Sequence, residues 1–321
     1  MSLYDYAEML FRSARIDAFR AAIERVVEPG MRVLDLGTGL GTYAMFAAQA
    51  GARVTALDSD RVIHLARSLA ERNGLADRIE FVHGRAPEAL PPERWDLVIF
   101  EDYSTPFVSA ASHGLLRTIA ADHLAPGGRL LPDGFRLGLT PVSAVGPVAR
   151  DPGMAGSDVR FGLSWTDLRR QMANCGQKAF LPADVLIAPL EPGPRRPILP
   201  VPAPADLEVR AAWDASERPV TGLALWFDLD LGDGVWVSNE PGRDPDRVAE
   251  PWGQWLLPVD PPLSAPGTRM EARVWWETRS DGLPGWMAWS CTAGDATRRG
   301  HEFAGIPLSL DDLTGGKPEA P

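Results

Sequence analysis

Short apolar runs separated by helical patterns fill the first 133 residues of the chain. Each run is a few residues long and stops at a glycine, a charged residue or a turn, which is typical of a strand buried in a sheet. The runs that we predict to be strands are residues 33–36, 54–57, 79–83, 95–100 and 129–131. Helical spacing of apolar residues is found at 4–26, 42–50, 60–73 and 107–122. This alternation predicts an α/β fold with a parallel, Rossmann-like sheet.

The pattern changes in the second half of the chain, where apolar and polar residues alternate. Residues 222–231 and 269–277 place every second side chain on one apolar face, with loops rich in glycine and proline between such stretches. These features predict an antiparallel barrel or sandwich. We expect two modules that join near residues 133–140. Residues 161–180 read as a short helix that the barrel does not need, so its apolar side chains are candidates for docking on another subunit.

A glycine-rich turn follows the first predicted strand. Gly37, Gly39 and Gly41 let the backbone approach a ligand and supply N–H groups at a helix start. A dinucleotide fingerprint would place its third glycine one residue later, where the chain has Thr42. With Asp35 two residues before the first glycine, the motif Asp-x-Gly-x-Gly-x-Gly is instead the form seen in methyltransferases that use S-adenosylmethionine (SAM). We therefore predict SAM as the cofactor.

Acidic residues stand at or next to the carboxyl ends of three predicted strands. Asp35, Asp58 and Glu101 occupy these positions. Open parallel sheets bind ligands at the carboxyl ends of their strands, so the three side chains should meet in one crevice. There Asp58 is placed to accept hydrogen bonds from both hydroxyls of a ribose, and Asp35 lies near the amino-acid end of the cofactor. For Glu101 the alternative is a structural acid that caps a neighbouring helix.

Composition and charge narrow the class of protein. The chain has 45% hydrophobic and 23% charged residues, as in an ordinary globular protein. No apolar run is long enough to span a membrane and the N-terminus does not resemble a signal peptide, so we expect a cytoplasmic protein. The net charge of −11 disfavours nucleic acid as a partner. Two cysteines and five scattered histidines show no metal-binding spacing, so we expect no metal.

Several short motifs resemble those of the protein arginine methyltransferases, and the resemblance runs along nearly the whole chain. The lid helix of that family carries Met-Leu and then an arginine, as do Met9, Leu10 and Arg15 here. Further matches fall at 45–51, 124–128, 132–133 and 250–252. The resemblance implies a lid helix and SAM-binding domain at residues 1–133 and a β-barrel substrate domain at 134–321. It also implies a helical dimerisation arm at about 159–190, and hence a homodimer.

The resemblance assigns the cofactor contacts. Arg15 would pair with the carboxylate of SAM, because a planar guanidinium suits a carboxylate. Asp35 would lie near the methionine amine, and Asp58 would hold the ribose. The other implied contacts are Met9, Gly37, Gly39, Gly41, Ser59, Arg85, Ala86 and Glu101.

The resemblance is weaker at the methyl-acceptor end. The family grips its guanidinium with two glutamates on one loop, of which Glu101 would be the first, whereas the second falls at Ala110. The histidine of the barrel loop is replaced by Pro251, and its acidic partner in the lid falls at Arg12.

Other side chains near these positions are candidates for the acceptor end. Asp102 or Tyr103 would stand in for the missing acid, although each can instead be a plain loop residue. Trp252 would form a wall of the pocket, or else pack in the core.

Three functions remain open on this basis. The first is methyl transfer from SAM to arginine or a guanidine-like group, with Glu101 orienting the acceptor. The second keeps the enzyme class and changes the acceptor to a small metabolite or modified peptide. The third is a catalytically silent module that binds SAM or dimerises, which the retained glycines, Asp58 and Arg15 argue against.

Overall fold

The parallel sheet expected in the first half of the chain is confirmed. The computed structural model describes residues 3–12, 14–101, 103, 107–143, 159–166, 176–214, 216–242 and 252–302. In the parallel sheet the strand order is β3-β2-β1-β4-β5. The strands are β1 (Arg32–Leu36), β2 (Arg53–Asp58), β3 (Ile79–His83), β4 (Trp95–Phe100) and β5 (Leu124–Leu131). Thus β3 and β4 have the bounds expected from their apolar runs.

Helices alternate with these strands. They are α3 (Thr42–Gln49), α4 (Ile63–Arg72) and α5 (Ala110–Thr118), with a 3₁₀ turn at Ala76–Arg78 and a π-helical turn at Ile119–His123. The helix predicted from residue 107 begins at Ala110 instead. The reason is that Ser109 has an extended backbone and its hydroxyl accepts a hydrogen bond from the amide of Ser112, which caps the helix there.

The helix predicted over residues 4–26 is two helices, α1 (Leu3–Arg12) and α2 (Ala14–Val26). The two lie in different surroundings. The α2 helix buries Phe19 and Ile23 completely in the core, whereas Tyr4 and Phe11 on α1 are more than four-fifths exposed. The apolar residues between positions 4 and 26 therefore do not form one continuous buried face.

The second half of the chain forms two antiparallel sheets. The larger has the order β10-β6-β12-β14-β9, with β13 beside β12, and the smaller has the order β11-β15-β16-β17. The larger sheet consists of β6 (Gly134–Val142), β9 (Gln177–Ala179), β10 (Arg196–Pro197), β12 (Val220–Asp230), β13 (Trp236–Ser238) and β14 (Gln254–Leu263). The smaller consists of β11 (Val209–Asp214), β15 (Arg269–Thr278), β16 (Pro284–Ala293) and β17 (Ala296–His301). Short 3₁₀ turns lie at Ala183–Val185 and Pro204–Leu207.

These sheets approach each other along two edges, where β14 lies beside β17 and β6 beside β11. Within the described part of the chain, no strand pairing closes them into one ladder. The predicted β-barrel is therefore, as far as it is described, a pair of packed antiparallel sheets. The alternating pattern could not distinguish the two, because both bury one face of every strand.

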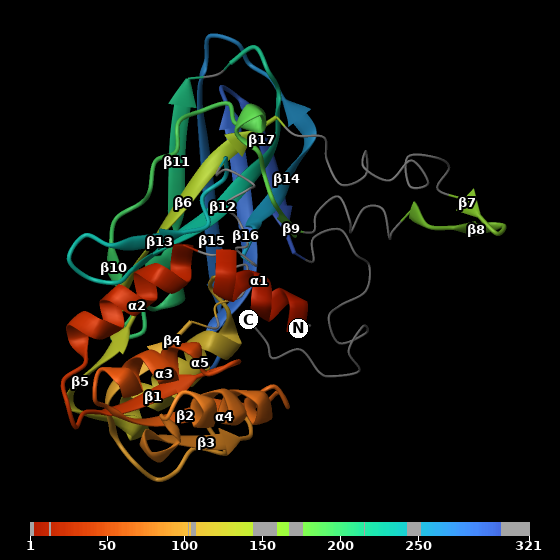
Figure 1. Cartoon of the computed structure of the whole chain (residues 1–321). Coiled ribbons are helices and arrows are strands. Elements are labelled where there is room, and N and C mark those ends of the chain that lie inside the picture. The colour runs from red at the N-terminus through yellow and green to blue at the C-terminus, as the bar shows by residue number, and fades with distance from the viewer. Residues whose placement is uncertain are drawn as a thin grey trace.

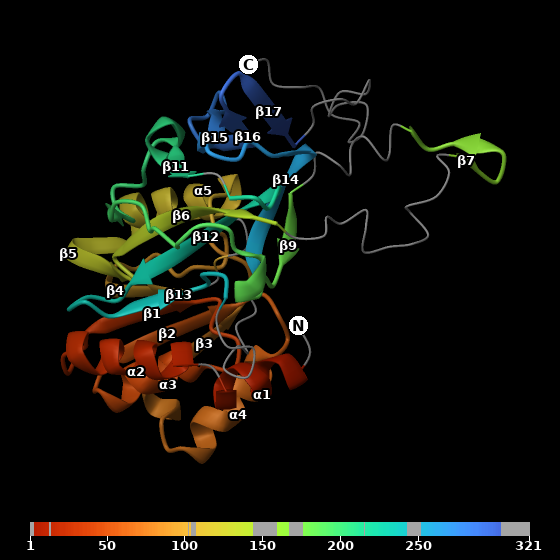
Figure 2. The same cartoon turned by 90° about the horizontal axis from the view of Figure 1, so that it is seen from above.

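The parallel and antiparallel parts lie side by side, with α2 at their border (Figures 1 and 2). Arg25 of α2 forms an ion pair with Asp233, in the turn between β12 and β13, at 2.9 Å. The ring of Phe107 lies 4.7 Å from that of Phe135 and 5.0 Å from that of Phe227, within one hydrophobic core that both parts share. The change of sheet falls between the end of β5 at Leu131 and the start of β6 at Gly134. A domain division there stays our proposal.

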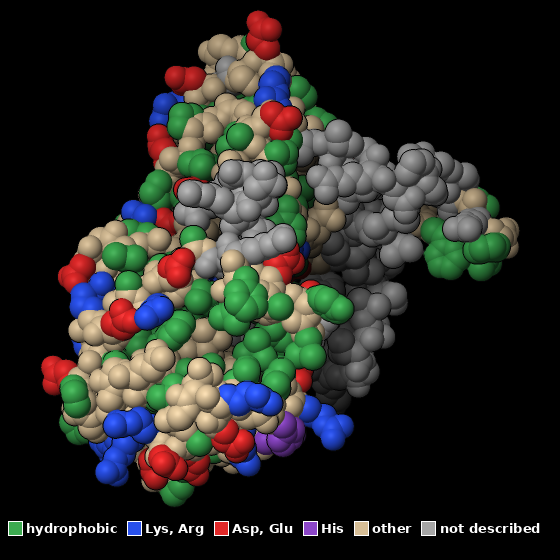
Figure 3. Space-filling model, viewed as in Figure 1, with side chains coloured by type: hydrophobic (Ala, Val, Ile, Leu, Met, Phe, Trp, Pro, Cys, Tyr) green, Lys and Arg blue, Asp and Glu red, His purple; other side chains and the backbone are tan. Residues whose placement is uncertain are grey.

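A small hairpin of β7 (Val159–Arg160) and β8 (Leu163–Ser164) projects from the molecule. Its apolar side chains lie in solvent, with Phe161 80% and Leu163 58% exposed (Figure 3). The short helix predicted over 161–180 is wrong at its two described ends, which contain the strands β8 and β9 instead, and residues 167–175 lie outside the described part of the chain. In the part of the chain that is described, no helix is long and apolar enough to cross a membrane. The cytoplasmic location stays a prediction.

Candidate active site

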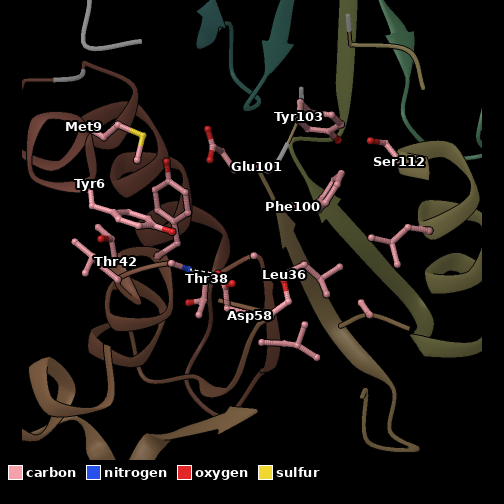
Figure 4. A pocket seen from close by; sticks show the side chains of 18 of the residues that line it. Tyr6, Met9, Leu36, Thr38, Thr42, Asp58, Phe100, Glu101, Tyr103 and Ser112 are labelled. Carbon is pink, nitrogen blue, oxygen red and sulfur yellow. Dashed lines mark hydrogen bonds between the residues drawn. The ribbon is translucent and has the colours of Figure 1, made fainter. Parts of the chain in front are cut away.

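A cavity of about 670 Å³ opens at the carboxyl ends of β1, β2 and β4. It is lined by the loops that follow these strands, by residues of the helices α1, α2, α3 and α5, and by residues from the second half of the chain. In Figure 4, Tyr6 and Met9 of α1 lie on one side of the cavity, Tyr103 and Ser112 lie on the other, and Glu101 lies between them. The expected crevice at the strand ends is therefore present.

The glycine turn supports one end of the cavity. Gly39 has a φ of +54°, and a Cβ atom there would lie 2.8 Å from the ring of Tyr6. No side chain therefore fits between the turn and α1. The amide of Gly39 donates a hydrogen bond of 2.8 Å to Asp58 Oδ2, and the amide of Asp60 donates one of 2.7 Å to Oδ1. These bonds fix the Asp58 carboxylate at the end of β2, where it lines the cavity.

Asp35 lies beneath the same turn and faces inward. Only 1% of it is exposed, and Oδ2 accepts hydrogen bonds from the hydroxyl of Thr38 at 2.6 Å and the amide of Ala44 at 3.0 Å. Burial raises the pKa of the Asp35 carboxyl to about 6, against the lowering effect of those two hydrogen bonds. The described contacts of Asp35 thus join β1 to the start of α3, and it does not line the cavity.

The centre of the cavity holds an ion pair between Arg15 of α2 and Glu101 at the end of β4. The Arg15 side chain is 2% exposed, and that of Glu101 is 22% exposed. The guanidinium carbon of Arg15 also lies 4.3 Å from the centre of the Trp252 ring, and Arg15 Nη2 lies 3.1 Å from Met9 Sδ. A guanidinium is therefore held between a carboxylate and the face of an indole.

Tyr103 lines the cavity next to Glu101. Its ring packs against Phe100 at 4.8 Å and Phe107 at 4.6 Å, and 3% of the residue is exposed. The hydroxyl has no hydrogen-bond partner among the described residues. Burial, and after it the negative charge of Glu101, raises the pKa of the phenol. Tyr103 therefore presents an unused, neutral hydroxyl at this end of the cavity.

Most of the side chains predicted from the sequence meet at this cavity. Its lining includes Met9, Arg15, Gly37, Gly39, Asp58, Ser59, Arg85, Ala86, Glu101, Tyr103 and Trp252. Asp35 and Gly41 lie outside the lining, and Asp102 lies outside the described residues. Their parts in binding or catalysis stay predictions.

Tyr6, Ser112 and Lys178 are among the lining residues that the sequence analysis missed. Tyr6 stands three positions before Met9 on one helix, so helical spacing was a usable signal for it. Ser112 lies in the first turn of α5, which starts at Ala110 rather than at the expected position. Lys178 belongs to the short edge strand β9, which pairs with β14 from a distant part of the chain. No local pattern indicates that pairing.

Comparison with known proteins places the chain among methyltransferases. The methyltransferase domain family matches residues 33–128. The chain is 30% identical over 290 residues to the arginine N(omega)-methyltransferase of Streptomyces achromogenes subsp. streptozoticus, an alignment that covers 84% of this chain and 74% of that protein. It is 34% identical over 143 residues to the protein arginine N-methyltransferase PRMT10 of Oryza sativa subsp. japonica, covering 44% of this chain and 38% of the rice protein.

Solved structures resemble the fold along almost its whole length. One is the Trypanosoma brucei PRMT1 enzyme-prozyme heterotetrameric complex with AdoHcy, with a TM-score of 0.74 and 22% identity over 92% of this chain and 97% of that one. Another is Arabidopsis thaliana protein arginine methyltransferase 10, with a TM-score of 0.72 and 18% identity over 94% of this chain and 98% of that one. At these identities the likeness concerns the fold.

Proposed function

The chain belongs to the arginine N-methyltransferase family, and we propose that it transfers a methyl group from SAM to a guanidine nitrogen of arginine or an arginine-type acceptor. The observation that supports this most strongly is the surroundings of Arg15. The cavity already holds one guanidinium, between the carboxylate of Glu101 and the ring of Trp252. An acceptor guanidinium needs the same two kinds of partner.

The residues at the other end of the cavity suit SAM. Asp58 offers a fixed carboxylate at a strand end, the usual partner of ribose hydroxyls in such folds. Gly39 presents only backbone at the turn, and the ring of Tyr6 packs against it. Arg15 is the cation proposed for the carboxylate of the cofactor. When bound, SAM supplies an electrophilic methyl group on a sulfonium.

Glu101 is the residue proposed to orient the acceptor. Its carboxylate can accept two N–H bonds from a guanidinium and hold the nitrogen in line with the methyl carbon. It can also draw the positive charge away from the attacking nitrogen. The acceptor nitrogen would form the new carbon–nitrogen bond as the methyl–sulfur bond of SAM breaks, with S-adenosylhomocysteine as the leaving group. The nitrogen would lose one proton to water, so the methylated guanidinium would keep its charge. Because Arg15 now occupies Glu101, the acceptor must displace or share that pair.

The hydroxyl of Tyr103 is the proposed second polar group at the acceptor end. Ala110 leaves no second carboxylate at that position, whereas Tyr103 is buried, lines the cavity and lacks a partner among the described residues. Trp252 is 5% exposed, so it packs in the core and forms the cavity wall at once. Membership of the arginine N-methyltransferase family does not favour a catalytically silent module.

A homodimer through residues 161–180 is also part of the proposal. The apolar tip of the β7–β8 hairpin would be covered by a partner, since Phe161, Leu163 and Val159 are all more than half exposed. Replacing Phe161 and Leu163 with serine should lower the solution mass measured by light scattering from twice that of the 34.8 kDa chain to that of one chain. An unchanged mass would contradict this arrangement.

Mass-spectrometric methyl transfer tests the proposed activity. The protein is incubated with SAM and, in separate tubes, with arginine and with arginine-rich peptides. We expect an acceptor to gain 14 mass units, roughly the mass of a methylene, and Glu101→Gln to abolish the gain. Glu28→Gln, in an exposed loop away from the cavity, is the matched control and should keep full activity. No gain on any guanidine would contradict the proposal.

A further inference from the structure

Lys178 is the cation that the antiparallel sheet contributes to the cavity among the described residues. It lies on β9, whose residues pair with β14, so that Lys178 stands opposite Trp255. Its stem passes close to the backbone of Gly253, where a Cβ atom would lie 3.2 Å from Lys178 Cγ. Its ammonium nitrogen is 5.4 Å from the centre of the Phe180 ring, at the exposed side of the strand.

A short series of contacts leads from Lys178 to Glu101. Gly253, beside the stem of Lys178, directly follows Trp252 in the chain. The Arg15 guanidinium lies over the ring of Trp252 and is paired with Glu101. The cavity therefore has a carboxylate at its centre and an ammonium at its rim, with one tryptophan between them. A ligand that fits both must carry a cation at one end and an anion at the other.

We propose that the acceptor is a free guanidino acid, such as arginine itself, whose guanidinium binds Glu101 and whose carboxylate binds Lys178. This inference rests on the proposed function and narrows its acceptor. The ammonium of lysine is a compact point charge that suits a single carboxylate. Burial lowers the pKa of Lys178, so its charge is partly desolvated and would be stabilised by an anion.

The same arrangement is unfavourable for an arginine within a polypeptide. Its carboxyl group is an amide and gives Lys178 no charge to bind. Arginine-rich segments also carry further cations next to the methylated one, and an ammonium at the rim repels these. Ala110 supports the same conclusion, because a site with one fewer carboxylate for the guanidinium gains more from a second point of attachment.

Kinetics with and without the acceptor carboxylate test the proposal. The probes are arginine, agmatine (arginine without its carboxylate) and a peptide with one internal arginine. We expect Lys178→Met to lower kcat/KM for arginine by about 10- to 100-fold, through KM, as expected for one charge-assisted bond. Its kcat/KM for agmatine should change by less than about threefold, and Lys178→Arg should restore most of the loss. Arg53→Met, at the exposed start of β2, is the control.

Three results would overturn the inference while leaving the proposed function intact. One is an equal loss for arginine and agmatine in Lys178→Met. Another is a raised KM for SAM in that variant, which would assign Lys178 to the cofactor. The third is a peptide methylated better than arginine and unaffected by the substitution. If none of the three probes is methylated by the unaltered protein, the proposed function fails, and this inference fails with it.

Discussion

Arg15 of α2 and Glu101 at the end of β4 form a buried ion pair at the centre of the cavity. The pair joins α2, which lines the cavity, to the strand end that we propose to bind the acceptor. Arg15 carries a guanidinium, the same group as the proposed acceptor. Its charge balances that of the Glu101 carboxylate until a ligand binds to one of the two residues. The pair thus connects the packing of α2 to the chemistry proposed for the site.

Replacing Arg15 should weaken both the fold and cofactor binding. Arg15→Ala leaves the Glu101 carboxylate largely buried without this partner, which should lower the free energy of unfolding by about 2 kcal/mol. Urea denaturation measures this, and calorimetry should show weaker SAM binding. Arg20→Ala removes an exposed pair with Glu24 on the same helix and should leave the denaturation midpoint unchanged. Equal effects of the two variants would contradict the importance of the buried pair.

Replacing Asp58 should weaken the binding of the cofactor and leave the KM for the acceptor nearly unchanged. Asp58→Asn keeps an oxygen for the Gly39 amide but loses the negative charge, so SAM should bind about 10- to 100-fold more weakly. Calorimetry measures the affinity, and steady-state kinetics should show little change in the KM for the acceptor at saturating SAM. Asp77→Asn, in an exposed turn, serves as the control. A normal SAM affinity in Asp58→Asn would refute the ribose assignment.

The hydroxyl of Tyr103 should lower the stability of the fold and contribute to activity. Because it is buried without a described partner, Tyr103→Phe should raise the free energy of unfolding by about 1 kcal/mol. The same change should lower kcat by about tenfold if the hydroxyl contacts the acceptor. Thermal denaturation and initial rates measure the two effects. If the variant is more stable and its kcat is unchanged, the Tyr103 side chain packs the site and its hydroxyl has no part in activity.

Asp35 should give the fold a distinctive dependence on pH. Its pKa is raised to about 6 in the folded state from the model-peptide value of 3.8, so the folded state holds this proton more tightly than the unfolded state. The contribution of Asp35 to stability is therefore largest below about pH 4 and falls, by roughly 3 kcal/mol, as the pH rises through about 6. Asp35→Asn should remove this fall. Urea denaturation of both proteins between about pH 4 and 7 measures the difference, and parallel curves would contradict it.

The strands and most of the cavity follow from the sequence because they depend on local patterns. The apolar runs that become β3 and β4 are bounded by turn residues, Asp58 is the last residue of β2, and Glu101 directly follows β4. Asp35 differs because it precedes the last residue of β1 and turns toward Thr38 beneath the glycine turn. An acid within a strand can face either side, and residue order alone does not decide which.

Features that depend on distant contacts could not be predicted in the same way. The position of Lys178 follows from the pairing of β9 with β14, more than 70 residues away in the chain. Whether the antiparallel strands close into a barrel depends on how two edges meet, and the alternation of apolar residues is the same in both cases. The start of α5 depends on the capping hydrogen bond of Ser109, which moved the expected boundary by three residues.

The most direct test of the central claim uses SAM labelled with ¹³C in its methyl group and follows the label by NMR after incubation with arginine. The account predicts a new signal of a methyl group on a guanidine nitrogen, which is lost in Glu101→Gln and retained in Glu28→Gln. A label on the α-amine, or no label on arginine or on any other guanidine although SAM binds normally, would contradict it.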